Sequence, residues 1–182
     1  MTGQAIAMAA TDGAGEDLRE RLGVLFDTHH ARLYRLARRL CNSAEDARDL
    51  VQDAFVRAAR SPHSIPHGAP NEEAWLVRVL INLARDRWRK RVVEKRALPL
   101  QSAGTPSKST PESAVIARAT VWRALRALAP RRRAIVVMYE LEGMEIPAIA
   151  ALLDVAPVTV RWHLSRGRRE LAKALQVSWR SS

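Results

Sequence analysis

Residues 145–171 read EIPAIAALLDVAPVTVRWHLSRGRREL, and this stretch decides the fold of the C-terminal half of the chain. Apolar residues at helical spacing predict a first helix, which ends at a turn over Asp154–Ala156. Pro157 then opens a second helix, because its missing N–H group has no helical partner in a first turn. Val160 and Leu164 are four residues apart and therefore share one face of this second helix.

The remaining faces of the second helix are polar and rich in arginine. They carry Arg161, Trp162, Ser165, Arg166, Arg168 and Arg169. A helix with a basic outer face, packed on a shorter apolar helix, is typical of a helix-turn-helix that binds DNA. The same pattern also fits a helical hairpin whose basic face is merely solvated, so the rest of the chain has to decide.

The charge balance indicates a polyanionic partner. The chain of 182 residues holds 30 Lys and Arg against 19 Asp and Glu, which gives a net charge of +11. Such an excess favours nucleic acid or an anionic membrane surface. No apolar run approaches the roughly 20 residues of a membrane span, and no basic residue precedes Arg19 to begin a signal peptide. The single cysteine, Cys41, cannot form an internal disulfide, which suits a cytoplasmic location.

Helical periodicity predicts three helices in the N-terminal half. Residues 1–15 are small and polar, and we expect a disordered lead there. One helix begins at Asp17, and a second follows over 43–60, with Ser43 as its N-cap. The stretch 61–70 contains three prolines and a glycine, which exclude a helix.

Asn71 is predicted to cap a third helix that continues over 74–94. A linker follows over 97–113, rich in Ser, Pro, Thr and Gly. The apolar pattern resumes at about residue 114, breaks at Pro130 and ends at Gly143 before the helix-turn-helix. No stretch alternates convincingly between apolar and polar residues.

The fold class is therefore all-α, with two small helical domains joined by a flexible linker. The predicted boundaries are a lead over 1–15, a first domain over 16–96, the linker over 97–113, a second domain over 114–177, and a tail over 178–182.

An acidic strip stands out on the predicted helix 43–60 of this basic protein. It consists of Glu45, Asp46, Asp49, Gln52 and Asp53. The strip is either a solvated face with local pairs, such as Asp53 with Arg57, or a docking face for a basic partner protein.

The end of the third helix, RDRWRKR over 85–91, surrounds Trp88 with four arginines and a lysine. This end is either a solvated surface around a half-buried tryptophan or a nucleic-acid contact in which arginines neutralise phosphates and aromatics stack on bases. The long loop 61–70 beside it is a candidate recognition loop.

The sequence holds no pattern that indicates catalysis, a cofactor or a metal site. His29 and His30 are adjacent and diverge on a helix, so they cannot chelate one ion well. No stretch resembles a nucleophile turn or a glycine-rich phosphate loop.

Two segments together resemble a known family. DLVQDAF over 49–55, followed by AWLVRVLINLARDRWRKR over 74–91, is similar to region 2 of the sigma-70 family. Residues 128–171 resemble region 4 of the small extracytoplasmic-function (ECF) sigma factors, which keep only regions 2 and 4. The resemblance covers about residues 20–95 and 115–175. It implies a bacterial ECF sigma factor, a polymerase subunit that confers promoter recognition and is not itself an enzyme.

The resemblance also implies roles for particular residues. Asp49, Gln52 and Asp53 match positions that contact the β′ clamp helices of core RNA polymerase, and region 4 is expected to meet the β flap. The −10 promoter element is expected to contact Arg78, Asn82, Arg85, Asp86 and Trp88. The −35 element is expected to contact Thr159, Arg161, Trp162, His163, Ser165, Arg166 and Arg168. The loop over 61–71 is expected to receive a flipped base, and an anti-sigma factor is a further expected partner.

Departures from the family pattern are local. The first helix of the helix-turn-helix starts EIPAI, so Pro147 has to lie in its first turn, and Asp154 replaces the usual turn glycine. Val158 stands where glycine is common, and Trp162 stands where a small residue is frequent. Three rival functions are a DNA-binding regulator that acts without polymerase, a nucleic-acid-modifying enzyme and, more distantly, a basic membrane-attached helix.

Overall fold

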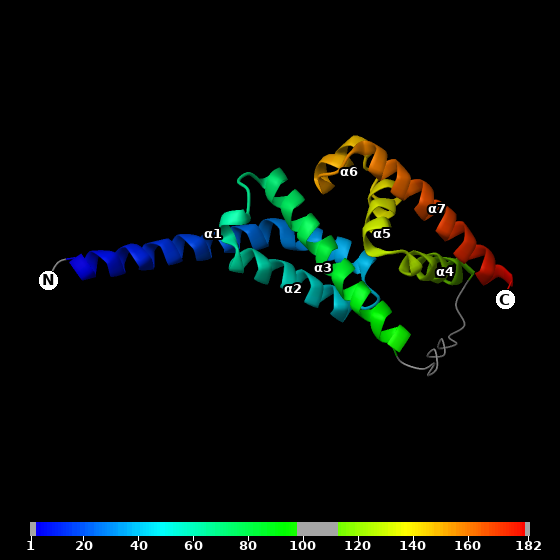
Figure 1. Cartoon of the computed structure of the whole chain (residues 1–182), viewed down its shortest axis with the longest axis horizontal. Helices are drawn as coiled ribbons and strands as arrows, with labels where there is room; N and C mark the ends of the chain where they lie inside the picture. The colour runs from blue at the N-terminus through cyan, green and yellow to red at the C-terminus, as the bar shows by residue number, and fades with distance from the viewer. Residues whose placement is uncertain (1–2, 98–112, 181–182) are drawn as a thin grey trace.

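The computed structural model describes residues 3–97 and 113–180, and every regular element in these ranges is a helix, which confirms the all-α prediction (Figure 1). The elements are α1 (Gly3–Leu40), α2 (Ala44–Arg60), the short 3-10 helix η1 (Pro62–Ser64), α3 (Ala69–Ala97), α4 (Ser113–Ala127), α5 (Pro130–Val136), the π-helical turn η2 (Val137–Leu141), α6 (Ile146–Leu153) and α7 (Pro157–Arg180).

Helices α1, α2 and α3 pack together into an N-terminal body. Its centre consists of fully buried leucines, namely Leu33, Leu36, Leu50, Leu76 and Leu80. Ser43 caps α2 as predicted, because its side chain accepts a hydrogen bond of 3.0 Å from the Asp46 amide. Two acidic residues then fill the first turn of α2, where the helix dipole favours negative charge.

Two helix starts differ from the sequence predictions. Helix α1 begins at Gly3, so the backbone that was expected to be a disordered lead is helical, in keeping with the alanine-rich stretch that follows Gly3. Helix α3 begins at Ala69, so Asn71 lies inside its first turn and is not its N-cap. The start is set by Gly68, whose φ of 91° turns the chain and whose carbonyl accepts from the Asn71 amide at 2.9 Å.

Helices α4 to α7 form a C-terminal body that contains the predicted helix-turn-helix. Pro147 lies in the first turn of α6 and Pro157 opens α7, both as expected. Asp154 ends α6 in the left-handed conformation, with φ 54°, which is a conformation that glycine adopts more readily. Gly143 ends the preceding π-helical turn, also with positive φ.

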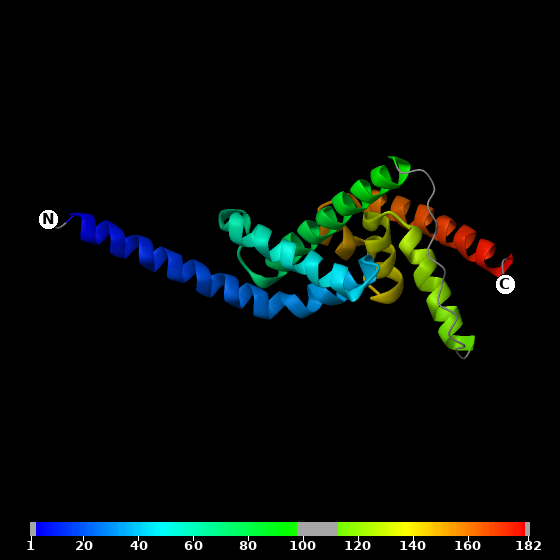
Figure 2. The same cartoon turned by 90° about the horizontal axis from the view of Figure 1, so that it is seen from below.

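The two bodies lie against each other (Figure 2). Helix α3 packs against α5 and α6, and α1 packs against α5. Buried residues from both bodies form one continuous cluster, which runs from Leu25 in α1 to Leu164 in α7. The predicted linker lies almost entirely outside the described residues, so its flexibility stays a prediction.

Candidate polymerase and DNA interfaces

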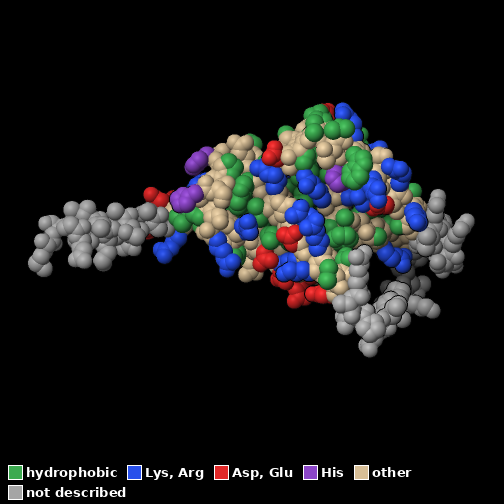
Figure 3. Space-filling model, viewed as in Figure 1, with side chains coloured by type: hydrophobic (Ala, Val, Ile, Leu, Met, Phe, Trp, Pro, Cys, Tyr) green, Lys and Arg blue, Asp and Glu red, His purple; other side chains and the backbone are tan. Residues whose placement is uncertain are grey.

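Helix α7 presents a basic outer face to solvent. Its inner face is anchored by Val160 and Leu164, both buried, as their spacing predicted. The outward residues Arg161, Ser165, Arg166, Arg168 and Arg169 are all exposed. Figure 3 shows Lys and Arg side chains over the C-terminal body and α3, with a group of Asp and Glu side chains over α2.

The arginines of α7 differ in how strongly they are already paired. Arg168 donates to Glu140 at 2.7 Å, and this hydrogen bond is the main reason that the pKa of Arg168 is raised. Arg166 pairs with Glu170 one turn along the helix, at 3.3 Å. Arg161 forms no ion pair with any residue that the structure describes, so its guanidinium is free for an external acceptor.

Three other predicted members of the −35 surface lie in mixed environments. Trp162 is 51% exposed, and the guanidinium groups of Arg132 and Arg166 each lie 5.8 Å from its ring centroid. Thr159 is half-buried. His163 is half-buried too, and its pKa is lowered first by burial and then by Arg132 and Arg131. A neutral, partly inward imidazole is less available to DNA than the surrounding arginines.

The acidic strip on α2 is exposed at the three positions predicted to meet polymerase. Asp49, Gln52 and Asp53 all face solvent. Asp53 accepts a hydrogen bond of 2.5 Å from Arg87 of α3, so the local pair with Arg57 that the sequence suggested is replaced by a pair between helices. Both partners are substantially solvated, which makes the pair weak enough to be exchanged for an external one.

An apolar groove between α1 and α2 adjoins this strip. Gln52 lines the groove together with Phe26, Phe55 and Val56. Phe26 is 44% exposed and Val56 is 39% exposed, and the rings of Phe26 and Phe55 lie 4.8 Å apart. A protein partner could therefore bury apolar side chains beside the acidic ones, which is the usual composition of a protein interface. Sequence reasoning missed this groove because its residues come from two helices.

The predicted −10 residues share one side of α3 but are unequally accessible. Asn82 and Asp86 are exposed, and Arg85 lies at 3.4 Å from the Asp86 carboxylate. Arg78 is half-buried, and its guanidinium donates to the Leu152 carbonyl of α6 at 3.4 Å. Trp88 is half-buried in a pocket between the two bodies. The structure therefore brings the five residues onto one helix while covering two of them with the C-terminal body.

Arg133 is a charged residue that sequence reasoning missed. Its side chain is only 3% exposed, and its guanidinium donates to the carbonyls of Leu40, Arg126 and Leu128. Burial lowers the pKa of Arg133 to about 10. These carbonyls end helices α1 and α4, so one buried cation supplies donors to helix ends in both bodies.

Neither a metal centre nor a membrane helix is found in the described part of the chain. No group of three or more His, Cys, Asp or Glu side chains there is placed to bind a metal ion. None of the described helices combines the length and apolar character that a membrane crossing requires.

Comparison with known proteins identifies the two bodies. The family model described as Sigma-70 region 2 matches residues 25–93, within α1 to α3. The model described as Sigma-70, region 4 matches residues 118–171, within α4 to α7. The chain is also 36% identical over 151 residues to the ECF RNA polymerase sigma factor SigM of Mycobacterium tuberculosis, covering 83% of this chain and 75% of that protein. The chain belongs to the sigma-70 family.

Further relatives place this sigma factor in the ECF type, as the sequence resemblance indicated. The ECF sigma factor SigL of Mycobacterium tuberculosis is 32% identical over 171 residues, which cover 93% of this chain and 97% of SigL. As an ECF sigma factor, the protein directs promoter recognition and transcription initiation. Its N-terminal body is region 2, and its C-terminal body is region 4.

Solved structures agree with this fold. The sigma factor RpoE of Bartonella quintana, in complex with the anti-sigma factor NepR, gives a TM-score of 0.56 at 25% identity, over 89% of this chain and 98% of that one. CnrH, in complex with the cytosolic domain of CnrY, gives the same TM-score and identity over 87% of this chain and 90% of that one.

Proposed function

We propose that the sigma factor binds core RNA polymerase through the acidic strip of α2 and reads the two promoter elements with α3 and α7. The observation that carries the proposal is the separation of charge: an exposed acidic strip lies on one body and an arginine-rich helix-turn-helix on the other. A regulator that binds duplex DNA without polymerase has no use for an acidic face, because that face repels phosphates.

The polymerase surface consists of Asp49, Gln52 and Asp53 together with the adjoining groove. The carboxylates orient a basic partner such as the β′ clamp helices, and exposed Phe26 and Val56 supply apolar area that is buried on docking. Region 4 contacts the β flap in the same complex. The charge pair between Asp53 and Arg87 exchanges for pairs with polymerase.

The −35 surface consists of the exposed face of α7, with Thr159 and His163 at its edge. A helix of this kind fits the major groove, where an arginine can bind a guanine through two hydrogen bonds. Arg161 is the best candidate for this contact because its guanidinium has no ion pair within the described chain. The guanidinium groups of Arg166 and Arg168 already form ion pairs with Glu170 and Glu140. We assign these two arginines to phosphate contacts, which position the helix without reading the base sequence.

The −10 surface consists of Arg78, Asn82, Arg85, Asp86 and Trp88 on α3. Exposed amide and guanidinium groups can bind the edges of unpaired bases, and the adjoining loop 61–71 can receive a flipped base. Unstacking a base costs a few kcal/mol, which the polymerase complex as a whole supplies. The protein therefore needs no catalytic residue, and we propose that it is not an enzyme.

An anti-sigma factor is a further partner in this proposal. The sigma factor RpoE of Bartonella quintana, whose fold this chain shares, is bound to the anti-sigma factor NepR in its solved structure. An anti-sigma factor that covered the acidic strip and the adjoining groove would prevent the binding of polymerase to this surface. We further propose that the protein acts in the cytoplasm, where polymerase and promoter DNA are found.

Run-off transcription with core polymerase on genomic promoter fragments tests the function directly. Wild-type protein should support specific transcripts, and no promoter-specific transcript with any fragment set would refute the proposal. Asp49→Arg with Asp53→Arg should abolish co-purification with core polymerase. The matched control is Asp17→Arg with Glu20→Arg, which makes the same charge change on exposed positions of α1 and should leave binding intact.

The DNA surfaces are tested separately. Arg161→Ala should weaken −35-dependent promoters more than affinity for random duplex, by about 1–3 kcal/mol for one lost base contact. An equal loss on random duplex would assign Arg161 to phosphate binding instead. Asn82→Ala should impair open-complex formation with core binding intact, and a loss of core binding would contradict its place on the −10 surface.

A further inference from the structure

A pocket lies where the two bodies meet, and arginines line it from both sides. Its volume is about 150 Å³, whereas one ordered water needs about 10–15 Å³. Arg87 and Arg91 of α3 line the pocket together with Arg126 of α4 and Arg133 of α5. Asp46 of α2 is the only carboxylate among the lining residues. Four arginines therefore face one carboxylate, in a space large enough for a small molecule.

The arginines of the pocket are only partly neutralised by the protein itself. Arg91 lies 3.9 Å from the Asp46 carboxylate, which is longer than a hydrogen bond. Arg126 forms no ion pair with any residue that the structure describes. Arg87 is the exception, because it pairs with Asp53 at 2.5 Å. At least two guanidinium groups at the pocket are therefore available to an external acceptor.

Arg133 adds a buried positive charge to the wall of the pocket. Its side chain is 3% exposed, and its Nε is buried without a hydrogen-bond partner in the described part of the chain. Burial is the main reason that the pKa of Arg133 is lowered, and the positive charges of Arg126 and Arg91 lower it further. The three guanidinium groups thus lie close enough to repel one another. An anion in the pocket would relieve this repulsion.

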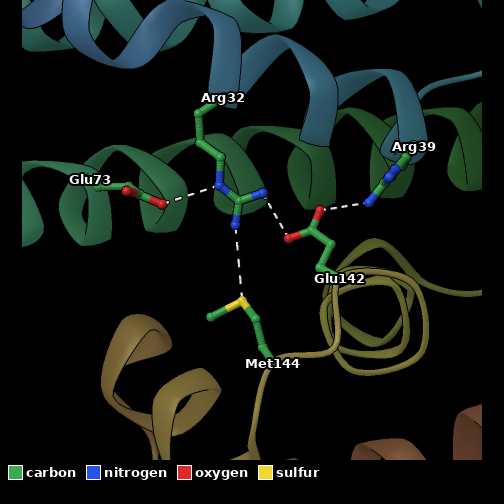
Figure 4. Close-up of polar contacts among 5 residues, drawn as sticks. All are labelled: Arg32, Arg39, Glu73, Glu142 and Met144. Atoms are coloured by element: carbon green, nitrogen blue, oxygen red, sulfur yellow. Dashed lines mark hydrogen bonds and ion pairs between the residues drawn. The ribbon is translucent and has the colours of Figure 1, made fainter.

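A second group of arginines between the same two bodies is neutralised (Figure 4). The Glu142 carboxylate lies 2.7 Å from the Arg32 guanidinium and 2.7 Å from that of Arg39. Arg32 also contacts Glu73 at 3.2 Å and the Met144 sulfur at 3.9 Å. Two arginines there meet two carboxylates at hydrogen-bond distance. The excess of positive charge is therefore a particular feature of the pocket and does not simply follow from the basic composition of the chain.

The uncharged side chains of the pocket suit an oxyanion as well. Asn42 lines the pocket and is exposed, so its amide can donate to a ligand oxygen. Trp88 is half-buried and supplies a flat apolar wall. Burial raises the pKa of the Cys41 thiol, so this side chain stays neutral and adds no negative charge. Guanidinium groups bind phosphate oxygens through paired, charge-assisted hydrogen bonds.

We propose that this pocket binds a small phosphate-bearing ligand, with Arg91 and Arg126 as hydrogen-bond donors and Arg133 as a buried positive charge beside them. Inorganic phosphate, pyrophosphate and the phosphate end of a nucleotide share this oxyanion chemistry. A nucleic-acid backbone carries the same group, but a cavity of about 150 Å³ does not admit a duplex. The proposal goes beyond promoter recognition, and its test uses neither polymerase nor promoter DNA.

Isothermal titration calorimetry of the full-length protein with pyrophosphate, at constant ionic strength, measures the binding. Arg91→Gln and Arg126→Gln should each weaken the affinity about tenfold, because each removes a charge-assisted hydrogen bond. The matched controls are Arg89→Gln on α3 and Arg123→Gln on α4. Both are exposed, remove the same charge and do not line the pocket, so they should leave the affinity unchanged.

Asp46→Asn tests the sign of the charge that the pocket selects. It removes the only carboxylate of the lining, so pyrophosphate should bind about threefold more tightly. Weaker binding of pyrophosphate to this variant would contradict an anion site. Arg133→Gln should abolish binding, but it also removes the hydrogen bonds to three backbone carbonyls. The exposed Arg126 therefore carries the test even if that variant fails to fold.

Cys41 reports whether the ligand occupies this pocket or another part of the basic surface. It is the only cysteine of the chain, is 7% exposed and lines the pocket. Pyrophosphate at about ten times its Kd should slow modification of Cys41 by a thiol reagent about tenfold. The same concentration should protect Cys41 much less in Arg126→Gln.

Three outcomes would overturn the proposal. The first is the absence of pyrophosphate binding by the wild type. The second is an equal affinity in the wild type, the pocket variants and the controls, because binding would then occur elsewhere on the basic surface. The third is protection of Cys41 by a single-stranded oligonucleotide but not by pyrophosphate, which would assign the arginines of the pocket to a nucleic-acid backbone.

Discussion

Replacing Gly167 by alanine should destabilise the C-terminal body, although alanine is the better helix former. Gly167 lies where α7 crosses α5, and an added Cβ would lie 2.7 Å from Val136 Cγ2 and 3.2 Å from Arg132 Cγ. Val136 is 2% exposed, so its methyl group cannot swing into solvent. Alanine gains about 1 kcal/mol of helix propensity over glycine. Overpacking a buried contact costs about 1–3 kcal/mol.

The net expectation for Gly167→Ala is a loss of about 1 kcal/mol, or a fall in Tm of about 4–8 °C for a domain of this size. Urea unfolding followed by circular dichroism at 222 nm measures the change in free energy of unfolding. Gly23→Ala is the matched control, because no atom lies within 4 Å of its added Cβ. This control should gain about 0.5–1 kcal/mol.

Val136→Ala supplies the decisive background, because it removes the methyl group that the new Cβ would meet. In that background Gly167→Ala should cost less or become stabilising, because only the looser contact with Arg132 Cγ at 3.2 Å still opposes the helix-propensity gain. Stabilisation by Gly167→Ala in the wild-type chain, equal to that of Gly23→Ala, would refute the reasoning. It would mean that α7 and α5 are not in close contact at this point.

Three further expectations concern single residues. Ser43→Ala should cost about 1 kcal/mol in urea unfolding, because the hydrogen bond from the Asp46 amide to the cap is lost; no change would mean that α2 is capped otherwise. Asp154→Gly should gain about 0.5–1 kcal/mol, since φ 54° strains any side chain; a loss would contradict the left-handed turn. The lowered pKa of His163 means that its stabilisation is present above pH 6.5 and is lost as pH falls below 6.5, because the unfolded chain binds the proton first. His163→Gln should therefore flatten the pH dependence of stability below 6.5 compared with the wild type.

The helix-turn-helix could be predicted because each of its signals is local. Pro157 sets the start of α7, and the four-residue spacing of Val160 and Leu164 sets its buried face. The cap at Ser43 is likewise decided within a few residues of itself. The start of α3 was misjudged because a proline, Pro70, was taken to exclude a helix, whereas proline fits the first turn.

The contacts between the bodies could not be predicted in the same way. Arg32 and Glu142 are 110 residues apart, and each alone is typical of a solvated helix surface. The burial of Arg133 could not be predicted from the sequence either. Its three hydrogen-bond acceptors are backbone carbonyls, and every residue carries a backbone carbonyl, so no sequence pattern marks them. Arg78 and Trp88 both lie on α3, but the sequence does not encode that residues of the C-terminal body cover them.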